Sequence, residues 1–212
     1  MLFDFATLTP STCYKLLVSV IVPRPIAWVV SQDVHGKMNA APYSFFNAFS
    51  ADPPVLGIGI GRRSSGRAKD TRANIIETGE FVVNLVSEET AQAMNVTAIE
   101  FEPDVDELAE AGLTVCPSMR VKPPRIAESP VAMECGLLQM VDLGPNSGIV
   151  LGRVLAVHVR DDAVIDPTSG YIDTPRLELI GRMHGTGWYA RTSDRFEMPR
   201  IPVSAWKGAT GR

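Results

Sequence analysis

Apolar residues either alternate with polar or small ones or run continuously over several short stretches of the chain. This pattern is typical of strands, and it predicts strands over residues 19–22, 26–31, 55–61 and 80–87. Residues 38–47 follow a turn at 33–36 and return toward the strand 26–31, which predicts an antiparallel hairpin. The first half of the chain is therefore expected to form a sheet from neighbouring strands.

Two longer apolar runs, over residues 131–143 and 149–160, are joined by 144–148, whose Gly, Pro, Asn and Ser are typical of a hairpin turn. Residues 176–182 are expected to form the last strand. Short helices are predicted over 9–17, after Ser87, and over 106–111. Seven or eight mostly antiparallel strands with short peripheral helices predict a mainly β fold, a closed or split antiparallel β-barrel. No linker divides residues 1–212, so a single domain is expected.

The predicted strand 55–61 has the sequence VLGIGIG, in which Gly57, Gly59 and Gly61 alternate with leucine and isoleucine. Successive side chains of a strand point to opposite faces, so one face is apolar and the other is bare backbone. Such a glycine face often marks the close approach of a ligand or of another backbone, and a bend in a barrel gives the same pattern. A dinucleotide-binding G-x-G-x-x-G is excluded, because Arg62 and Ser64 occupy the positions of its last glycine.

Basic residues concentrate directly after this strand. Arg62, Arg63, Arg67, Lys69 and Arg72 stand against one aspartate, which gives a local charge of +4. Asp70 and Thr71 are good N-cap residues for a helix that Gly79 ends. Lys69 would then lie beside the N–H groups of a helix N-terminus, where a phosphate is favoured. A solvated basic loop is the alternative, and the sequence does not decide between the two.

The overall charge argues against a nucleic acid as the main partner. The 212 residues carry a formal charge of −4 with a pI near 5.4, whereas proteins that bind nucleic acids present a broad basic face. No apolar run reaches the roughly 18 residues that cross a bilayer. Asp4 interrupts any secretory signal, so a cytoplasmic location without membrane contact is expected.

Residues of the usual catalytic and metal-binding types are few and scattered. Cys13, Cys116 and Cys135 form no C-x-x-C pair, and with three histidines they give no metal-site spacing, so no metal is predicted. His158 lies between two valines of a predicted strand and is interpreted as a structural or interface residue. His184, in RMHGTGWY, either lines a pocket or lies in a surface turn. No G-x-S-x-G nucleophile elbow occurs.

Four motifs, in order, give the chain a resemblance to a known family. They are R-P-I-A-W-V from Arg24, N-x-A-P-x-S-x-F-N from Asn39, S-x-D-P-P from Ser50 and K-D-T-x-x-N-I from Lys69. With EFVVNLV at 80–86 they resemble the flavin reductase-like, FMN-binding split-barrel proteins, which include flavoredoxins and flavin reductase components. The resemblance covers about residues 20–90, with weaker support from 179–192. At His184 the chain departs from the glycine that many relatives carry.

The resemblance implies a bound FMN, with FAD as the alternative, and NADH or NADPH as the hydride donor. It implies that Asn39, Ala41, Ser44, Phe45, Phe46 and Asn47 run along the isoalloxazine edge, that Arg24, Trp28 and Ser31 border the same groove, and that Arg62, Lys69 and Thr71 hold the phosphate. The flavin would supply the redox chemistry, so no catalytic acid or base of the protein is implied. The family also implies a homodimer with the flavin near the subunit interface, and an oxygenase or other electron acceptor as a partner.

Three functions are compatible with these features. The preferred one is an NAD(P)H-dependent flavin reductase that passes hydride from reduced nicotinamide to flavin. The second is a flavoredoxin-like electron carrier with tightly bound FMN, for which the same motifs would serve. The third is a similar barrel that binds another ligand, such as haem or pyridoxal phosphate.

Overall fold

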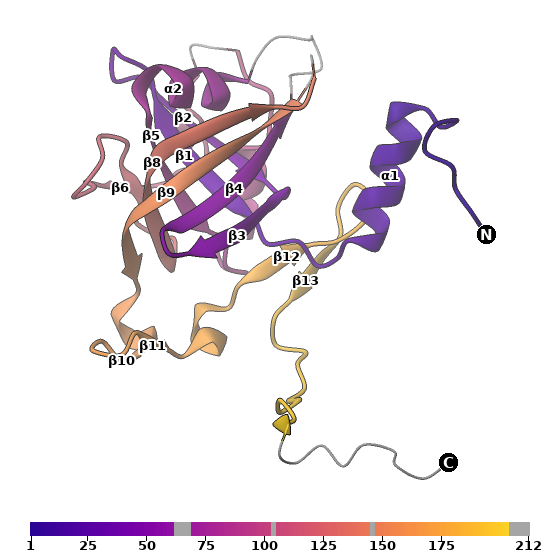
Figure 1. Ribbon diagram of the computed structural model, residues 1–212. Coiled ribbons are helices and arrows are strands. Elements are labelled where there is room, and N and C mark those ends of the chain that lie inside the picture. Colours follow the sequence, from indigo (N-terminus) through magenta and orange to yellow (C-terminus); the bar gives the residue numbers. More distant parts are fainter. Residues whose placement is uncertain (62–68, 103–104, 145–146, 204–212) are drawn as a thin grey trace.

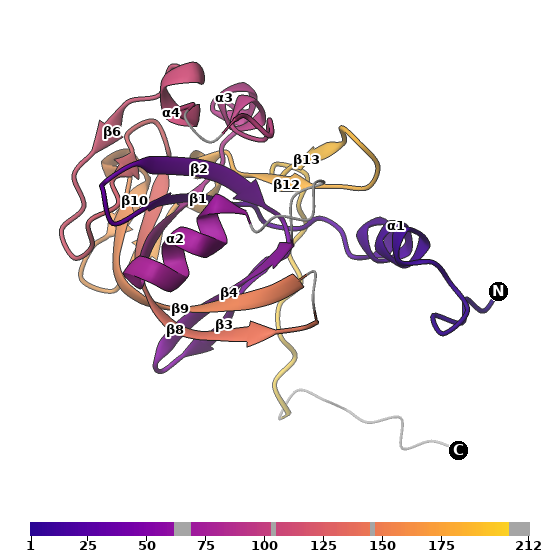
Figure 2. The same ribbon diagram turned by 90° about the horizontal axis from the view of Figure 1, so that it is seen from above.

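The structure is a computed structural model that describes residues 1–61, 69–102, 105–144 and 147–203. Its centre is a seven-stranded sheet with the spatial order β2-β1-β5-β8-β9-β4-β3, in which every neighbouring pair is antiparallel. The strands are β1 (Ala27–Gln32), β2 (Met38–Tyr43), β3 (Phe46–Ala51), β4 (Pro54–Gly61), β5 (Glu80–Leu85), β8 (Val131–Asp142) and β9 (Ser147–Val159). The sheet curls around its own core (Figures 1 and 2). The predicted mainly β, antiparallel fold is confirmed.

Short elements surround the curled sheet. Three further strand pairs are β6 (Val115–Cys116) with β7 (Arg125–Ile126), β10 (Val164–Asp166) with β11 (Tyr171–Ile172), and β12 (Ile180–Arg182) with β13 (Tyr189–Arg191). The helices are α1 (Pro10–Val20), α2 (Asp70–Thr78), α3 (Ala91–Val96) and α4 (Glu107–Glu110), with 3-10 turns η1 (Asp161–Ala163) and η2 (Thr174–Leu177). Helix α1 stands apart from the sheet, whereas α2 packs against β1 (Figures 1 and 2). No helix of the described segments has the length and hydrophobicity to cross a membrane.

Strand β1 is buried on both faces. Trp28 and Val30 belong to one apolar cluster, and Ala27 and Val29 belong to another on the opposite side of the strand. Both clusters extend into β5, because β1 and β5 pair in register from Ala27 to Val30. The run of apolar residues in this strand is therefore continuous because both faces of the strand are buried in apolar clusters.

The glycine face of β4 is confirmed, but the chain itself covers part of it. A Cβ atom at Gly57 would lie 2.5 Å from the Phe49 ring, and one at Gly59 would lie 2.9 Å from the Cβ of Phe45. The opposite face carries Leu56, Ile58 and Ile60, which are buried in the core. Because these glycines have no side chain, Phe45 and Phe49 can pack directly against the backbone of β4.

The helix termini match the sequence pattern only in part. Thr9 caps α1 as predicted, since its hydroxyl accepts the N–H of Thr12 at 3.2 Å. The helix continues to Val20, so the strand predicted over 19–22 is wrong. Gly79 ends α2 with a φ of +73°, also as predicted. The helix already begins at Asp70, after Lys69 and without a side-chain cap, so the predicted capping by Asp70 or Thr71 is wrong.

Two other predicted segments differ. Residues 38–47 do not form one strand, because β2 ends at Tyr43 and β3 begins at Phe46. The last predicted strand, 176–182, is wrong over its first half, where η2 and the left-handed Glu178 (φ +48°) precede β12. The two long strands are confirmed as β8 and β9, whereas residues 145 and 146 of the predicted turn lie outside the described segments.

Candidate functional site

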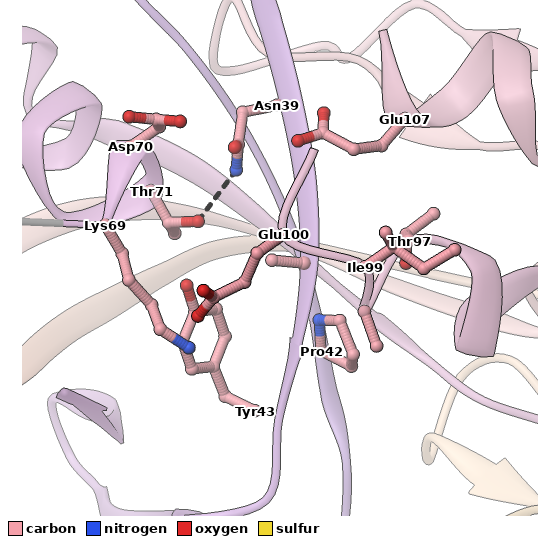
Figure 3. Close-up of a pocket in the computed structure, with 12 residues that line it drawn as sticks. Asn39, Pro42, Tyr43, Lys69, Asp70, Thr71, Thr97, Ile99, Glu100 and Glu107 are labelled. Atoms are coloured by element: carbon pink, nitrogen blue, oxygen red, sulfur yellow. Dashed lines mark hydrogen bonds between the residues drawn. The ribbon is translucent and has the colours of Figure 1, made fainter. Parts of the chain in front are cut away.

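Two cavities meet at the end of β2, and both are lined by Pro42, Tyr43 and Lys69. The larger one, called the groove, has a volume of about 630 Å³ and extends over β3 and β4 to the facing ends of β8 and β9. The smaller one, called the recess, has a volume of about 80 Å³ and lies between the start of α2, β2, residues 97–100 and Glu107 (Figure 3).

The groove has mainly apolar walls. Phe45, Phe46 and Phe49 line it together with the glycines of β4. Tyr14 of α1 also lines it, with its ring centre 6.2 Å from that of Phe45. Small-molecule sites typically have volumes of about 300–1,000 Å³ and apolar, aromatic walls. The groove therefore has the size and the surface to take a flat aromatic ring.

The recess is polar. Asn39 and Thr71 are both buried, and the Asn39 amide donates a hydrogen bond of 2.7 Å to the Thr71 hydroxyl (Figure 3). The ammonium group of Lys69 lies 5.2 Å from the ring centre of Tyr43. Figure 3 shows Lys69 and Glu100 pointing toward each other at one side of this space. Lys69 thus lies where the polar recess joins the apolar groove.

Trp28 and Ser31 support the walls from behind and do not border either cavity, which corrects the expectation for both. Their side chains are fully buried. The indole N–H of Trp28 donates to the hydroxyl of Thr97, a recess residue, at 2.9 Å. The Asn74 amide donates to the hydroxyl of Ser31 at 3.2 Å.

Arg24 also differs from the expectation, because its guanidinium group is taken up by the chain itself. Nη1 donates to the carbonyl groups of Val18 (2.8 Å) and Ile21 (2.7 Å), and Nη2 donates to that of Met183 (2.9 Å). Nε donates to the Ser44 hydroxyl at 3.4 Å. Burial lowers the Arg24 pKa from its ordinary value, a shift that nearby Tyr14 opposes. Arg24 is therefore a clamp that joins α1 and the β12–β13 hairpin to the loop containing Ser44.

An acidic side chain in the recess was missed by the sequence analysis. Glu107, at the start of α4, is only 8% exposed and lines the recess opposite Lys69 (Figure 3). Burial raises its pKa, and the charges of Asp70 and Asp106 raise it further, against hydrogen bonds from its own N–H and that of Ala40. Nothing in the sequence distinguishes Glu107 from the solvated acids common in short helices.

The structure brings eight of the twelve predicted site residues to the two cavities. They are Asn39, Ala41, Ser44, Phe45, Phe46, Asn47, Lys69 and Thr71. Arg62 lies outside the described segments. His184 lines neither the groove nor the recess; it stacks on Trp188 at the exposed tip of the β12–β13 hairpin, with ring centres 6.4 Å apart.

The model of the family described as "Flavin reductase like domain" matches residues 19–174, which is most of the chain. The chain belongs to the flavin reductase-like family. A Deinococcus radiodurans member of uncharacterized function is 42% identical over 209 residues, which cover 97% of this chain and 92% of that protein.

Solved structures of similar proteins extend this finding. Component B of nitrilotriacetate monooxygenase from Bacillus cereus is 35% identical, with a TM-score of 0.87 over 93% of this chain and 98% of that one. The 2-nitrobenzoate 2-nitroreductase NbaA of Pseudomonas fluorescens is 32% identical, with a TM-score of 0.88 over 100% of both chains. A split-barrel protein of Shewanella frigidimarina, 23% identical, has a TM-score of 0.80 over 95% of this chain and 100% of its own, and shares the fold. The predicted split-barrel fold of the flavin reductase-like family is thus confirmed.

Proposed function

We propose that this protein, with residues 1–212 acting as one domain, binds FMN and reduces it with NADH or NADPH, with FAD as the alternative flavin. The observation that carries the proposal is the junction at Lys69 between an apolar groove and a polar recess. A flavin mononucleotide has the same division, because a flat, largely apolar ring system is joined to a charged phosphate. The family membership supports a flavin as the ligand, in preference to haem or pyridoxal phosphate.

The residues of the two cavities fit the two ends of such a ligand. The phenylalanine side chains and the backbone of residues 44–47 would hold the ring in the groove. Lys69, Thr71 and the first N–H groups of α2 would bind the phosphate, since a helix N-terminus favours an anion. A bound flavin supplies the hydride-accepting chemistry, and the protein supplies position and electrostatics. No acid or base of the chain is assigned to the hydride transfer.

The reduced flavin needs an electron acceptor. The Bacillus cereus neighbour is a component of a monooxygenase, which supports a separate oxygenase as the partner. The Pseudomonas fluorescens neighbour is a nitroreductase, which supports a nitroaromatic compound as the second class of acceptor to be tested. A flavoredoxin-like carrier is the alternative, in which bound FMN only relays electrons. The cytoplasmic location stays a prediction from the sequence.

The proposed function is tested by a visible spectrum of the protein loaded with FMN, recorded before and after anaerobic addition of NADH or NADPH. We expect flavin absorbance that one of the two donors bleaches within the time of mixing and measurement. We further expect donor oxidation to continue when free flavin is supplied. A colourless protein that does not quench FMN fluorescence at micromolar concentration contradicts the proposal. Bound flavin that neither donor reduces supports the carrier instead.

We also propose a homodimer. Figure 1 shows α1 and the segment after β13 extending away from the sheet. Both carry exposed apolar side chains, namely Tyr14, Leu17, Val20 and Ile21 on and after α1, and Phe196, Met198, Ile201 and Val203 after β13. Apolar surface of this kind is typical of interfaces. Light scattering is expected to give twice the 23.0 kDa chain mass, and a monomer mass at working concentration contradicts the proposal.

A further inference from the structure

The recess contains a buried carboxyl group beside the residues assigned to the phosphate. Glu107 lines both the recess and an adjoining hollow of about 160 Å³ on the other side of Asn39 and Asp70. One carboxyl oxygen accepts the N–H of Ala40 at 3.3 Å. Figure 3 shows the carboxyl end pointing toward Asn39, whose amide donates to Thr71. Glu107 therefore faces the space that a phosphate would enter.

Among the described residues around this space, carboxyl groups outnumber ammonium groups. The charged residues that line the recess and the hollow besides Glu107 are Lys69 and Asp70 of the α2 start, Glu100, and Asp33 and Lys37 of the β1–β2 turn; Asp106 precedes Glu107 on its own segment. An ionised Glu107 carboxylate would repel a phosphate that enters the recess, because two anions would then share one small space. A phosphate at Lys69 and Thr71 is therefore bound more favourably when Glu107 is neutral.

Glu107 is the carboxyl group best placed to lose its charge. Its burial disfavours the carboxylate and raises its pKa, as do Asp70 and Asp106, whereas Asp33 of the same space has a pKa lowered by N–H groups of its turn. A phosphate close by would disfavour the carboxylate further. A neutral carboxyl group has one O–H donor, and an O–H donated to an anionic oxygen makes a short, strong hydrogen bond.

We propose that Glu107 binds the phosphate of the ligand as a neutral acid, so that each FMN bound takes up one proton. This inference rests on the proposed function. With one oxygen accepting from Ala40, the other carries the proton into the recess. When ligand binding takes up a proton, the affinity falls as the pH rises, because the proton concentration is lower. The recess thus selects phosphate esters and releases them as the pH increases.

The test is a fluorescence titration of FMN and of riboflavin, which has no phosphate, between pH 7 and 8.5. Three proteins are compared: wild type, Glu107→Gln, and Glu110→Gln as a matched control, since Glu110 is an exposed glutamate of the same helix. For wild type and the control we expect FMN affinity to fall by up to about tenfold per pH unit. Glu107→Gln keeps a donor without a titrating proton, so its FMN affinity should not change with pH. At pH 8.5 it should exceed that of wild type about tenfold. Riboflavin affinity should be independent of pH throughout.

Calorimetric titration in two buffers of different ionisation enthalpy counts the protons directly. Wild type is expected to take up close to one proton per FMN at pH 8, and Glu107→Gln none. A thermal melt shows whether Glu107→Gln is folded. If it is not, the proton count for wild type still tests the inference.

Three results would overturn the inference. A wild type whose FMN affinity and proton uptake show no pH dependence means that Glu107 does not titrate with the ligand. If the FMN affinity of Glu107→Gln falls with pH as steeply as that of wild type, the proton is taken up by the phosphate, whose own second pKa is about 6. If the FMN affinity of Glu110→Gln is also independent of pH, the pH dependence of wild type comes from the general surface charge and not from Glu107. Failure of wild type to bind FMN at any pH instead contradicts the proposed function itself.

Discussion

Replacement of Glu134 by alanine is expected to lower the free energy of unfolding by about 3–5 kcal/mol. The Glu134 side chain is fully buried in β8, where its carboxylate accepts the N–H groups of Met119 (2.9 Å) and Arg120 (2.5 Å). His158 Nε2 of β9 lies 2.5 Å from the same carboxylate. Truncation would leave these partly buried donors without their carboxylate partner, and each unsatisfied buried donor costs about 1–3 kcal/mol. Urea unfolding measures the loss.

The same carboxylate gives the loss a pH dependence. Burial raises the Glu134 pKa, but the hydrogen bonds from Met119, Arg120 and His158 outweigh it and leave the pKa below its ordinary value of 4.5. The contribution of the Glu134 carboxylate to stability is therefore present above pH 4.5 and is lost as the pH falls through its lowered pKa. The exposed Glu77→Ala, the matched control, should change stability by no more than about 0.5 kcal/mol. A loss below about 1 kcal/mol for Glu134→Ala would mean that water replaces the carboxylate.

Lys69→Ala is expected to weaken FMN binding by about 10- to 150-fold and riboflavin binding far less. A charge-assisted hydrogen bond to a phosphate contributes roughly 1.5–3 kcal/mol, which corresponds to this range. Both ligands are titrated against wild type and variant at fixed salt, because ions screen exposed charges. Lys122→Ala removes the same charge from an exposed position and should leave both affinities unchanged. Equal losses for the two ligands would mean that Lys69 does not contact the phosphate. No loss for either ligand would favour the alternative, in which the basic residues between Arg62 and Arg72 form a solvated loop.

Local patterns predict much of this fold. The alternation of β4, the hairpin of β1 and β2, and the end of α2 at Gly79 all follow from residues close in sequence. The break between β2 and β3 does not, because it depends on a contact with the following strand, β4. The Gly59 N–H donates to the Phe45 carbonyl at 2.7 Å, which helps to place residues 44 and 45 between the two strands.

The predicted site residues that line the two cavities lie in contiguous motifs, Asn39–Asn47 and Lys69–Thr71. Trp28 and Ser31 do not line the cavities because β1 is buried on both faces, which is a property of the assembled sheet and cannot be read from the local sequence. Glu107 was missed for the same reason. Its burial results from the packing of α4 against β2, which brings together segments about 67 residues apart in sequence.

The Arg24 clamp joins parts of the chain that are synthesised at different times. Val18 and Ile21 are made before Arg24, and the last strand of the large sheet ends at Val159. The carbonyl group of Met183 follows Arg24 by 159 residues, and only then is the guanidinium that contacts Ser44 fully held. A nascent chain that ends at Val159 therefore contains every strand of the large sheet but lacks one carbonyl acceptor of the Arg24 guanidinium. The side chain that contacts Ser44 thus depends for its full set of hydrogen bonds on residues that are synthesised after the whole sheet.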